Sequence, residues 1–459
     1  MTFGKHIYCI GIAGVGVSAV ARYALATGSL VSGSDVRRSP LVDDLIRLGA
    51  DVVFSPDPRR LAEGIDAVVF SDDVPVNHPE RAAAHERSIP TYTFAEALGL
   101  MMGSSQTRVA ISGTNGKSTT TAMSGLLALD AERDPSIFVG SRLRELEGNF
   151  RLGHAGLFIA EADEYRDHFL HYRPTHAVVT NIELDHVDYF RTLSRILESF
   201  RKFIVPDVQL VVNADDPNCR ELWTGRANTT WFGFGPDAEV RVVDWQTHAG
   251  RQEFSLVHED KKHGPFSLQL PGKINVENAI AAMTMAKVIG IPWMQMSSTI
   301  SNFRGIWRRF EVLEPHGAIT VINDYAHHPT SVRGTIGAAK AFYPGRRIIA
   351  VFQPHHRHRL HALFDGFAQS FGAADVTILT DVYVVAGREA ANDPTPTSQD
   401  LLMAIERHDQ PIIYAPTLDN VKSAVADMAR PGDVVLLMGA GSIWEIGAAL
   451  AKELNHGNA

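Results

Sequence analysis

Short apolar runs recur along the chain, and turns and longer segments with helical periodicity separate them. Runs that are apolar at every position are typical of parallel strands that are buried on both faces. Their alternation with helical segments predicts an α/β fold. The expected strands are His6–Ile12, Leu30–Ser34, Asp51–Phe54, Ala67–Ser71, 109–112, Leu157–Ala160, Ala177–Thr180, Leu210–Val212, Val321–Asn323, Arg347–Phe352, Val376–Thr380 and Val434–Met438. The expected helices are Ser18–Thr27, Asn275–Ile289, Pro329–Phe342 and Leu360–Phe371.

This pattern divides the 459 residues into three α/β units. We expect an N-terminal Rossmann-like domain over residues 1–103, a central domain over 104–311 and a C-terminal Rossmann-like domain over 312–459. The polar segment 102–106 is typical of a connector between the first two. Within the central domain, the pattern changes to shorter strands between residues 229 and 270.

The charge and composition of the chain limit the classes of partner that we expect it to bind. The formal net charge is −9 and the chain has no basic run, so we expect no nucleic-acid partner. The two cysteines, Cys9 and Cys219, form neither a disulfide framework nor a metal-ligand pair, which favours a cytoplasmic location. No apolar run approaches the ~20 residues of a membrane span, so we expect no membrane partner. The apolar segment after Lys5 has some features of a signal peptide, but its glycines have a better explanation.

The loop at 113–118 follows an apolar strand and opens a helix. Gly113 and Gly116 allow backbone N–H groups to surround a phosphate, and the helix N-terminus adds positive potential. Lys117 would reach the β- and γ-phosphates, and the Ser118 hydroxyl would ligate Mg²⁺. A strict P-loop has glycine where Ile111 stands, so this is a variant loop. The sequence therefore predicts a central P-loop-type ATP-binding α/β domain.

A second glycine loop lies near the N-terminus. Gly14 and Gly16 followed by Ala19 fit the dinucleotide fingerprint, and Asp35 stands where that fingerprint has a ribose-binding carboxylate. By itself the loop would also suit a nicotinamide-dependent oxidoreductase. That hypothesis leaves the loop at 113–118 without a role.

Carboxylates and one histidine follow two strands of the central domain. Residues 161–164 read Glu-Ala-Asp-Glu, and His186 stands among carboxylates after the next strand. Ligands collect at the carboxyl ends of strands in open α/β sheets, and Mg²⁺ prefers hard oxygen donors. These residues therefore indicate a metal site, although a lone histidine is more often structural.

Basic side chains mark the start of the third domain. Arginines at 304–309 lie near the boundary, where one of them could stabilise charge during phosphoryl transfer. Histidines and arginines follow two strands, at 323–330 and at 352–359. Zinc is a weak candidate there, because no cysteine accompanies the histidines and the arginines would repel a cation. An anionic substrate pocket explains the same residues better.

Taken in order, these blocks resemble the Mur ligase family over essentially the whole chain. The resemblance rests on Gly-Ile-Ala-Gly-Val-Gly-Val-Ser at 11–18, Gly-Thr-Asn-Gly-Lys-Ser at 113–118, Thr-Asn-Ile-x-x-Asp-His at 180–186, Arg-Arg-Phe-Glu at 308–311 and Tyr-Ala-His-His-Pro-Thr at 325–330. It implies an ATP- and Mg²⁺-dependent ligase of peptidoglycan precursor synthesis. The blocks are most similar to those of the alanine-adding members, which implies UDP-N-acetylmuramate and L-alanine as substrates. A monomer and a homodimer both stay open.

The resemblance also assigns residues. It implies that ATP contacts Gly113, Thr114, Asn115, Gly116, Lys117, Ser118, Thr119, Asn275, Asn278, Arg309 and Asp324. It implies that the nucleotide sugar contacts Gly11, Ala13, Gly14, Val15, Gly16, Asp35 and Ser71. It implies that the metal is held by Ser118, Glu161 and His186. It implies that catalysis involves Lys117, His186, Arg309 and Asp324. The candidates for the incoming amino acid are Tyr325, His327, His355 and Arg359.

Three alternatives stay open beside this interpretation. A related ligase could join a murein tripeptide to the same nucleotide sugar. Asn115 and Ser118 stand where alanine-adding members usually carry histidine and threonine, while Gln-Pro-His at 353–355 favours those members. The other two are the NAD(P)-dependent oxidoreductase and a nucleotide-binding regulator without turnover.

Overall fold

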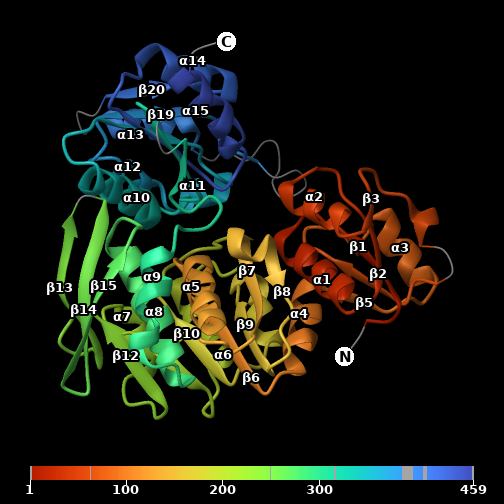
Figure 1. Cartoon of the computed structure of the whole chain (residues 1–459). Coiled ribbons are helices and arrows are strands. Elements are labelled where there is room, and N and C mark those ends of the chain that lie inside the picture. The colour runs from red at the N-terminus through yellow and green to blue at the C-terminus, as the bar shows by residue number, and fades with distance from the viewer. Residues whose placement is uncertain are drawn as a thin grey trace.

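The computed structural model describes residues 3–61, 64–248, 250–314, 317–384, 396–406 and 411–456. Its helices and strands form three α/β units, each built on its own sheet. Figure 1 shows the N-terminal unit in red and the C-terminal unit in blue, both lying against the central unit. The α/β class is confirmed, and the exact boundaries at residues 103 and 311 stay predictions.

The first sheet has five parallel strands in the order β3-β2-β1-β4-β5. The strands are β1 (His6–Ile10), β2 (Leu30–Ser34), β3 (Asp51–Val53), β4 (Ala67–Phe70) and β5 (Thr91–Thr93). Its helices are α1 (Val15–Ala26), α2 (Pro40–Arg47), α3 (Pro79–Glu86) and α4 (Phe94–Gly103), with a 3₁₀ turn at Pro58–Arg60. Because the strand order reverses between β1 and β4, the loops after these two strands border a ligand-binding crevice.

The central sheet has ten strands in the order β15-β14-β13-β12-β11-β10-β6-β9-β7-β8. The strands are β6 (Thr107–Ser112), β7 (Ser136–Leu143), β8 (Gly148–Arg151), β9 (Leu157–Glu161), β10 (His176–Val179), β11 (Gln209–Asn213), β12 (Thr229–Gly233), β13 (Val240–His248), β14 (Arg251–His258) and β15 (Lys261–Leu268). Its helices are α5 (Lys117–Asp130), α6 (Leu193–Phe203), α7 (Pro217–Trp223), α8 (Lys273–Val288) and α9 (Ser297–Asn302). The parallel strands β10, β6 and β9 bring their carboxyl ends to one edge.

The third sheet has the order β16-β17-β21-β18-β19-β20, with β16 antiparallel and the other strands parallel. The strands are β16 (Glu311–Leu313), β17 (Thr320–Asp324), β18 (Ile348–Phe352), β19 (Val376–Leu379), β20 (Ile412–Tyr414) and β21 (Val434–Met438). Its helices are α10 (Pro329–Phe342), α11 (Arg357–Ala362), α12 (Phe364–Ala368), α13 (Ser398–Glu406), α14 (Leu418–Met428) and α15 (Gly447–His456).

Three of the four expected helices differ in detail, and the one expected over Asn275–Ile289 spans Lys273–Val288. The first begins at Val15 rather than Ser18, directly after the glycine loop. The segment expected as one helix over Leu360–Phe371 is two short helices, α11 and α12, because the backbone leaves helical geometry at Leu363.

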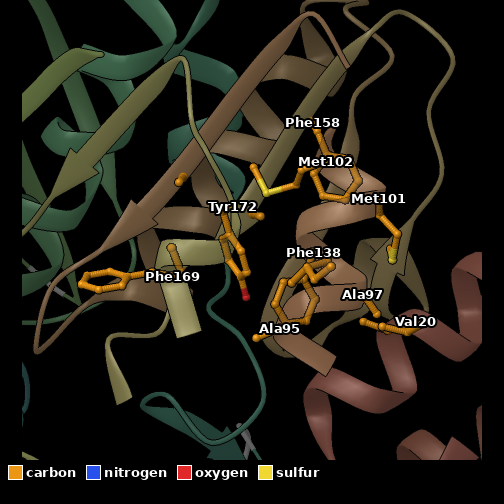
Figure 2. Close-up of a cluster of buried hydrophobic side chains, with 14 of the residues drawn as sticks. Val20, Ala95, Ala97, Met101, Met102, Phe138, Phe158, Phe169 and Tyr172 are labelled. Carbon is orange, nitrogen blue, oxygen red and sulfur yellow. The ribbon is translucent and has the colours of Figure 1, made fainter. Parts of the chain in front are cut away.

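The first two units share one apolar core. Val20 of α1 and several residues of α4 pack with Phe138 and Phe158 of the central sheet, as Figure 2 shows. Full burial of one such side chain contributes about 1.5–3 kcal/mol. Apart from Phe310, at the predicted boundary, the buried residues in the clusters around the third sheet all belong to the third unit. The first two units are therefore fixed to each other more firmly than either is to the third.

Candidate active site

A cleft of 810 Å³ lies where the three units meet. The seven residues predicted for the nucleotide sugar all line it: Gly11, Ala13, Gly14, Val15, Gly16, Asp35 and Ser71. A Cβ atom on Gly16 would come within 2.2 Å of the Phe94 ring, so this position requires glycine. Asp35 accepts hydrogen bonds from the backbone N–H groups of Ala13, at 2.8 Å, and Arg37, at 2.9 Å. This carboxylate therefore holds the glycine loop, and its contact with a ribose stays a prediction.

The predicted phosphate loop opens the same cleft from the central unit. Gly116 has a φ of +89°, which a residue with a Cβ rarely adopts, and α5 begins directly after it. Lys117 Nζ donates to the Gly113 carbonyl, at 2.6 Å, and lies 2.9 Å from Glu164 Oε2. Burial lowers the pKa of Lys117, and the facing carboxylates, above all Glu164, raise it more. A protonated lysine therefore stands beside the loop.

The predicted metal ligands fall into two groups. The Ser118 hydroxyl donates to Glu161 Oε1 at 2.9 Å, and the Gly140 N–H donates to the other oxygen. His186 lies instead with Asp163 and Glu164, and one ligand atom from each of these three lies within 4.8 Å of the others. Both groups sit at the carboxyl edge of the central sheet.

The second group fits a divalent cation, because it combines hard carboxylate oxygens with a ring nitrogen. Burial raises the pKa of Asp163, but His168 and Lys117 outweigh this effect and lower it, so the carboxylate is ionised. The motif at 161–164 indicated carboxylate ligands, but not that Asp163 and Glu164 would be the ones beside His186.

Arg309 lines the cleft, with its guanidinium 4.7 Å from the Tyr325 ring centroid. Asp324 is buried and accepts hydrogen bonds from the N–H groups of Phe310, at 2.7 Å, and Ala326, at 2.8 Å. It therefore fixes the backbone that carries Arg309. Its predicted contact with ATP stays a prediction.

The other predicted ATP contacts divide between the cleft surface and positions behind it. Thr114, Asn115, Gly116, Lys117 and Ser118 line the cleft, whereas Gly113, Thr119, Asn275 and Asn278 are not among its lining residues. Asn275 donates to the Pro271 carbonyl at 2.7 Å, and Asn278 donates to Asn275 at 3.3 Å. A Cβ on Gly116 would lie 2.1 Å from Asn278 Oδ1, so this pair packs directly against the loop.

A second cavity of 330 Å³ adjoins the cleft and contains all four amino-acid candidates: Tyr325, His327, His355 and Arg359. Arg359 Nε donates to Asp185 Oδ1 at 3.0 Å, and both side chains are buried. Burial lowers the pKa of His327 and of His355, and Arg359 lowers both further, so these rings are neutral. Within the described ranges, these histidines do not form a group close enough to hold a metal ion together.

Sequence reasoning missed several residues of the cleft. Tyr383 stacks on His355, with ring centroids 5.5 Å apart, and Tyr172 lines the cleft with a buried hydroxyl that has no hydrogen-bond partner among the described residues. Arg308 begins the Arg-Arg-Phe-Glu block but received no role, and it donates to the carbonyls of Gly439 and Gly441, at 2.7 and 3.2 Å. No local motif marks Tyr383 or Tyr172, because their neighbours come from distant segments.

Family models match almost the whole chain. The Mur ligase family catalytic domain matches residues 6–106, the Mur ligase middle domain matches 111–286, and the Mur ligase glutamate ligase domain matches 308–441. The chain belongs to the Mur ligase family.

Comparison with individual proteins shows which members of the family the chain resembles. The chain is 36% identical to a UDP-N-acetylmuramate–L-alanine ligase from Desulforamulus reducens, over 98% of both chains. A solved UDP-N-acetylmuramate-alanine ligase from Thermotoga maritima is similar with a TM-score of 0.83 and 25% identity, over 98% of both chains. A solved murein peptide ligase from Psychrobacter arcticus shares the fold, with a TM-score of 0.73 and 23% identity over 99% of both chains.

Proposed function

We propose that this chain is an ATP-dependent ligase that joins the lactyl carboxylate of UDP-N-acetylmuramate to the amino group of L-alanine in peptidoglycan precursor synthesis. The observation that carries the proposal is the convergence of three sites in one place. The N-terminal glycine loop and the phosphate loop line the same cleft, and the cavity with Tyr325 and Arg359 adjoins it. The full-length relatives named for this activity support the choice of substrates.

The proposed reaction has two steps. The lactyl carboxylate attacks the γ-phosphorus of ATP, and ADP leaves, which gives an acyl phosphate. The alanine amine then attacks the acyl carbon, the tetrahedral adduct loses inorganic phosphate, and the nitrogen releases a proton. The first step brings two anions together, so positive charge must offset their repulsion. Lys117 and Arg309 both line the cleft, and we propose that they supply this charge.

We also propose that Mg²⁺ is required. Ser118 and Glu161 would hold one ion, and Asp163, Glu164 and His186 would hold another. A bound ion would neutralise phosphate charge during transfer. The Lys117–Glu164 ion pair would then open as the lysine turns to the nucleotide.

The proposed substrates are small and soluble, and we propose a cytoplasmic location. None of the helices in the described ranges combines the length and apolar character of a membrane span.

Phosphate release tests the proposal. The purified protein is given ATP, Mg²⁺ and UDP-N-acetylmuramate, with L-alanine, with the murein tripeptide or with neither. Release that depends on L-alanine, with the mass of one alanyl residue added to the nucleotide sugar, is the expected result. Release with the tripeptide alone would show that the amino substrate is a peptide and not alanine. Release with neither amino substrate would contradict the proposed ligase reaction. A parallel titration with reduced nicotinamide dinucleotide is expected to show no fluorescence change.

A further inference from the structure

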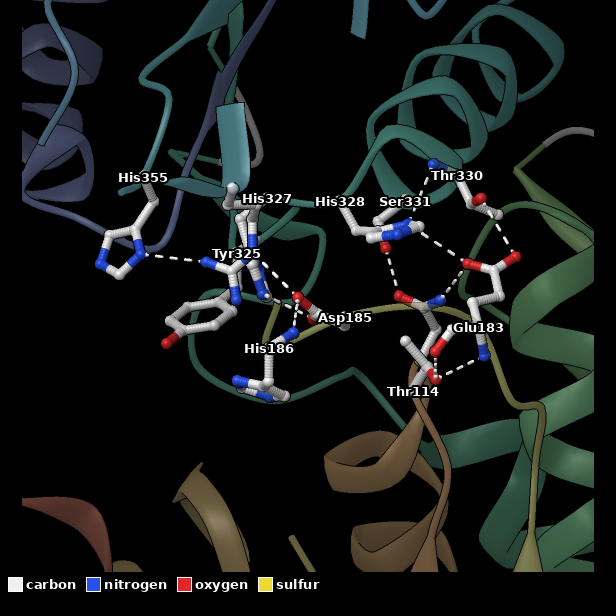
Figure 3. Close-up of polar contacts among 12 residues, drawn as sticks. Thr114, Glu183, Asp185, His186, Tyr325, His327, His328, Thr330, Ser331 and His355 are labelled. Carbon is white, nitrogen blue, oxygen red and sulfur yellow. Dashed lines mark hydrogen bonds and ion pairs between the residues drawn. The ribbon is translucent and has the colours of Figure 1, made fainter. Parts of the chain in front are cut away.

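The C-terminal unit meets the phosphate loop through a polar network, which Figure 3 shows. The Ser331 hydroxyl, in the first turn of α10, donates to Asn115 Oδ1 at 2.5 Å. The amide of Asn115 in turn donates to Glu183 Oε2 at 3.2 Å. Thr330 donates to the other carboxylate oxygen of Glu183 at 3.1 Å. The loop, the segment after β10 and the start of α10 are thus joined in one chain of contacts.

The backbone of Asn115 is fixed as firmly as its side chain. Its N–H donates to Asn181 Oδ1 at 2.9 Å, and its carbonyl accepts from the Thr180 hydroxyl, at 2.6 Å, and from the Asn181 amide, at 2.9 Å. All three backbone contacts come from the central unit. A displacement of α10 would therefore break the contact of Ser331 with the Asn115 side chain and leave the backbone of the loop in place.

A second set of contacts joins the start of α10 to the central unit. His328 caps α10, and its Nε2 atom lies 3.3 Å from the Leu184 carbonyl. The ring is buried, and its Nδ1 atom lies 3.2 Å from Glu183 Oε2. Glu183 therefore faces Asn115 on one side and the first turn of α10 on the other.

We propose that Asn115, Glu183 and Ser331 are positioning residues that couple docking of the C-terminal unit to the phosphate loop. The amide of Asn115 is engaged by protein at both of its atoms, so its role is to connect α10 with the loop. The buried apolar clusters around the third sheet are separate from those of the first two units, so polar contacts such as these contribute to its docked position. The kinetic part of the test rests on the proposed ligase activity.

The test begins with Ser331→Ala, which removes one donor and leaves the helix intact. Loss of one hydrogen bond that forms only in the docked state is expected to lower kcat about 3- to 10-fold. The KM for the nucleotide sugar should change less than about twofold, because its predicted site lies on the first unit. Ser331→Thr keeps the hydroxyl and should restore kcat. An unchanged kcat in Ser331→Ala would overturn the proposal.

A double-mutant cycle separates coupling from general damage. Asn115→Ala combined with Ser331→Ala should be no slower than Asn115→Ala alone, because the same contact is lost in both. The matched control is Arg142→Gln, which removes the 3.0 Å contact of Arg142 with Asp44 between the first two units. Its effect should multiply with that of Ser331→Ala. If the fold-decreases in kcat of Asn115→Ala and Ser331→Ala multiply in the double variant, the two residues act independently and the proposed coupling is wrong.

Small-angle X-ray scattering tests the coupling without turnover. With Mg²⁺ and a non-hydrolysable ATP analogue, Ser331→Ala should have a larger radius of gyration than the wild-type protein and Ser331→Thr. Equal radii of gyration for all three proteins would contradict the proposed coupling of α10 to the phosphate loop, even if the protein is an active ligase. If the wild-type protein shows no alanine-dependent phosphate release, the proposed function is wrong. The scattering comparison still tests whether Ser331 and Asn115 hold the C-terminal unit in its docked position.

Discussion

The ion pair between Arg359 and Asp185 leads to a prediction about stability, in which a second substitution should restore what the first one loses. Arg359 belongs to α11 of the C-terminal unit, and Asp185 belongs to the loop after β10 of the central unit. Their side chains are only 8% and 5% exposed. Burial raises the pKa of Asp185, but the positive charges around it, above all Arg359, together hold this pKa well below its usual value. Replacing Arg359 with methionine keeps the volume and leaves a buried carboxylate without its main partner.

The magnitude follows from that burial. Removal of one partner of a buried pair costs about 3–5 kcal/mol, whereas replacement of both partners by neutral groups is often nearly neutral. We therefore expect Arg359→Met to lower the free energy of unfolding by about 3–5 kcal/mol. For a unit of this size, that corresponds to a melting temperature lower by roughly 6–20 °C. The double variant Arg359→Met/Asp185→Asn should recover most of the loss.

Urea unfolding followed by tryptophan fluorescence measures this difference. Trp307 and Trp444 lie 5.0 Å apart across the junction with the third unit, so their emission reports its separation. Wild type, both single variants and the double variant complete the cycle. A double variant as unstable as Arg359→Met would refute the reasoning, because the loss would then come from packing rather than from an unpaired charge. Arg359→Ala should also raise the KM for the amino acid far more than that for ATP.

Three further predictions concern the cleft and its pH dependence. Lys117→Ala should abolish phosphate release while circular dichroism stays unchanged; measurable turnover would remove Lys117 from the ATP site. Asp163→Asn should raise the Mg²⁺ concentration for half-maximal activity at least about tenfold, since it removes one charged ligand, with Asp188→Asn as the matched control. The folded protein keeps His355 neutral, so protonation of the unfolded chain lowers stability as the pH falls below about 6.5. Between pH 7.5 and 5, the wild-type protein should lose about 2 kcal/mol more than His355→Gln in urea unfolding, and equal losses would contradict the neutral ring.

Local signals were enough to predict the elements that present the site. The turn at 113–118 needs a left-handed residue before its helix, and Gly116 supplies it with a φ of +89°. The N-terminal loop needs a position without a side chain against Phe94, and Gly16 meets that need. In both cases a few neighbouring residues determine the conformation, so the pattern along the chain contains the information.

Contacts between distant segments could not be predicted in the same way. Whether Glu161 or Asp163 faces His186 depends on how the backbone turns after β9, and there Glu161 accepts the N–H of Gly140 from a neighbouring strand. The stacking of Tyr383 on His355 depends on a bridge between two loops of the third unit. These choices are made by packing, which leaves no periodic signal.

The two kinds of contact between units determine where the cleft can open. Three substrates must enter, yet water must be kept from an acyl phosphate once it forms. Separation of the first two units would expose the shared core around Phe138 and Phe158, and each of those rings would lose about 1.5–3 kcal/mol of burial. Separation of the third unit breaks hydrogen bonds such as that between Ser331 and Asn115, which water replaces at a net cost of about 1 kcal/mol each. It also hydrates both partners of the Arg359–Asp185 pair together and parts the rings of Trp307 and Trp444. We therefore expect the cleft to open at the C-terminal unit, with the nucleotide-sugar loop and the phosphate loop keeping their mutual geometry.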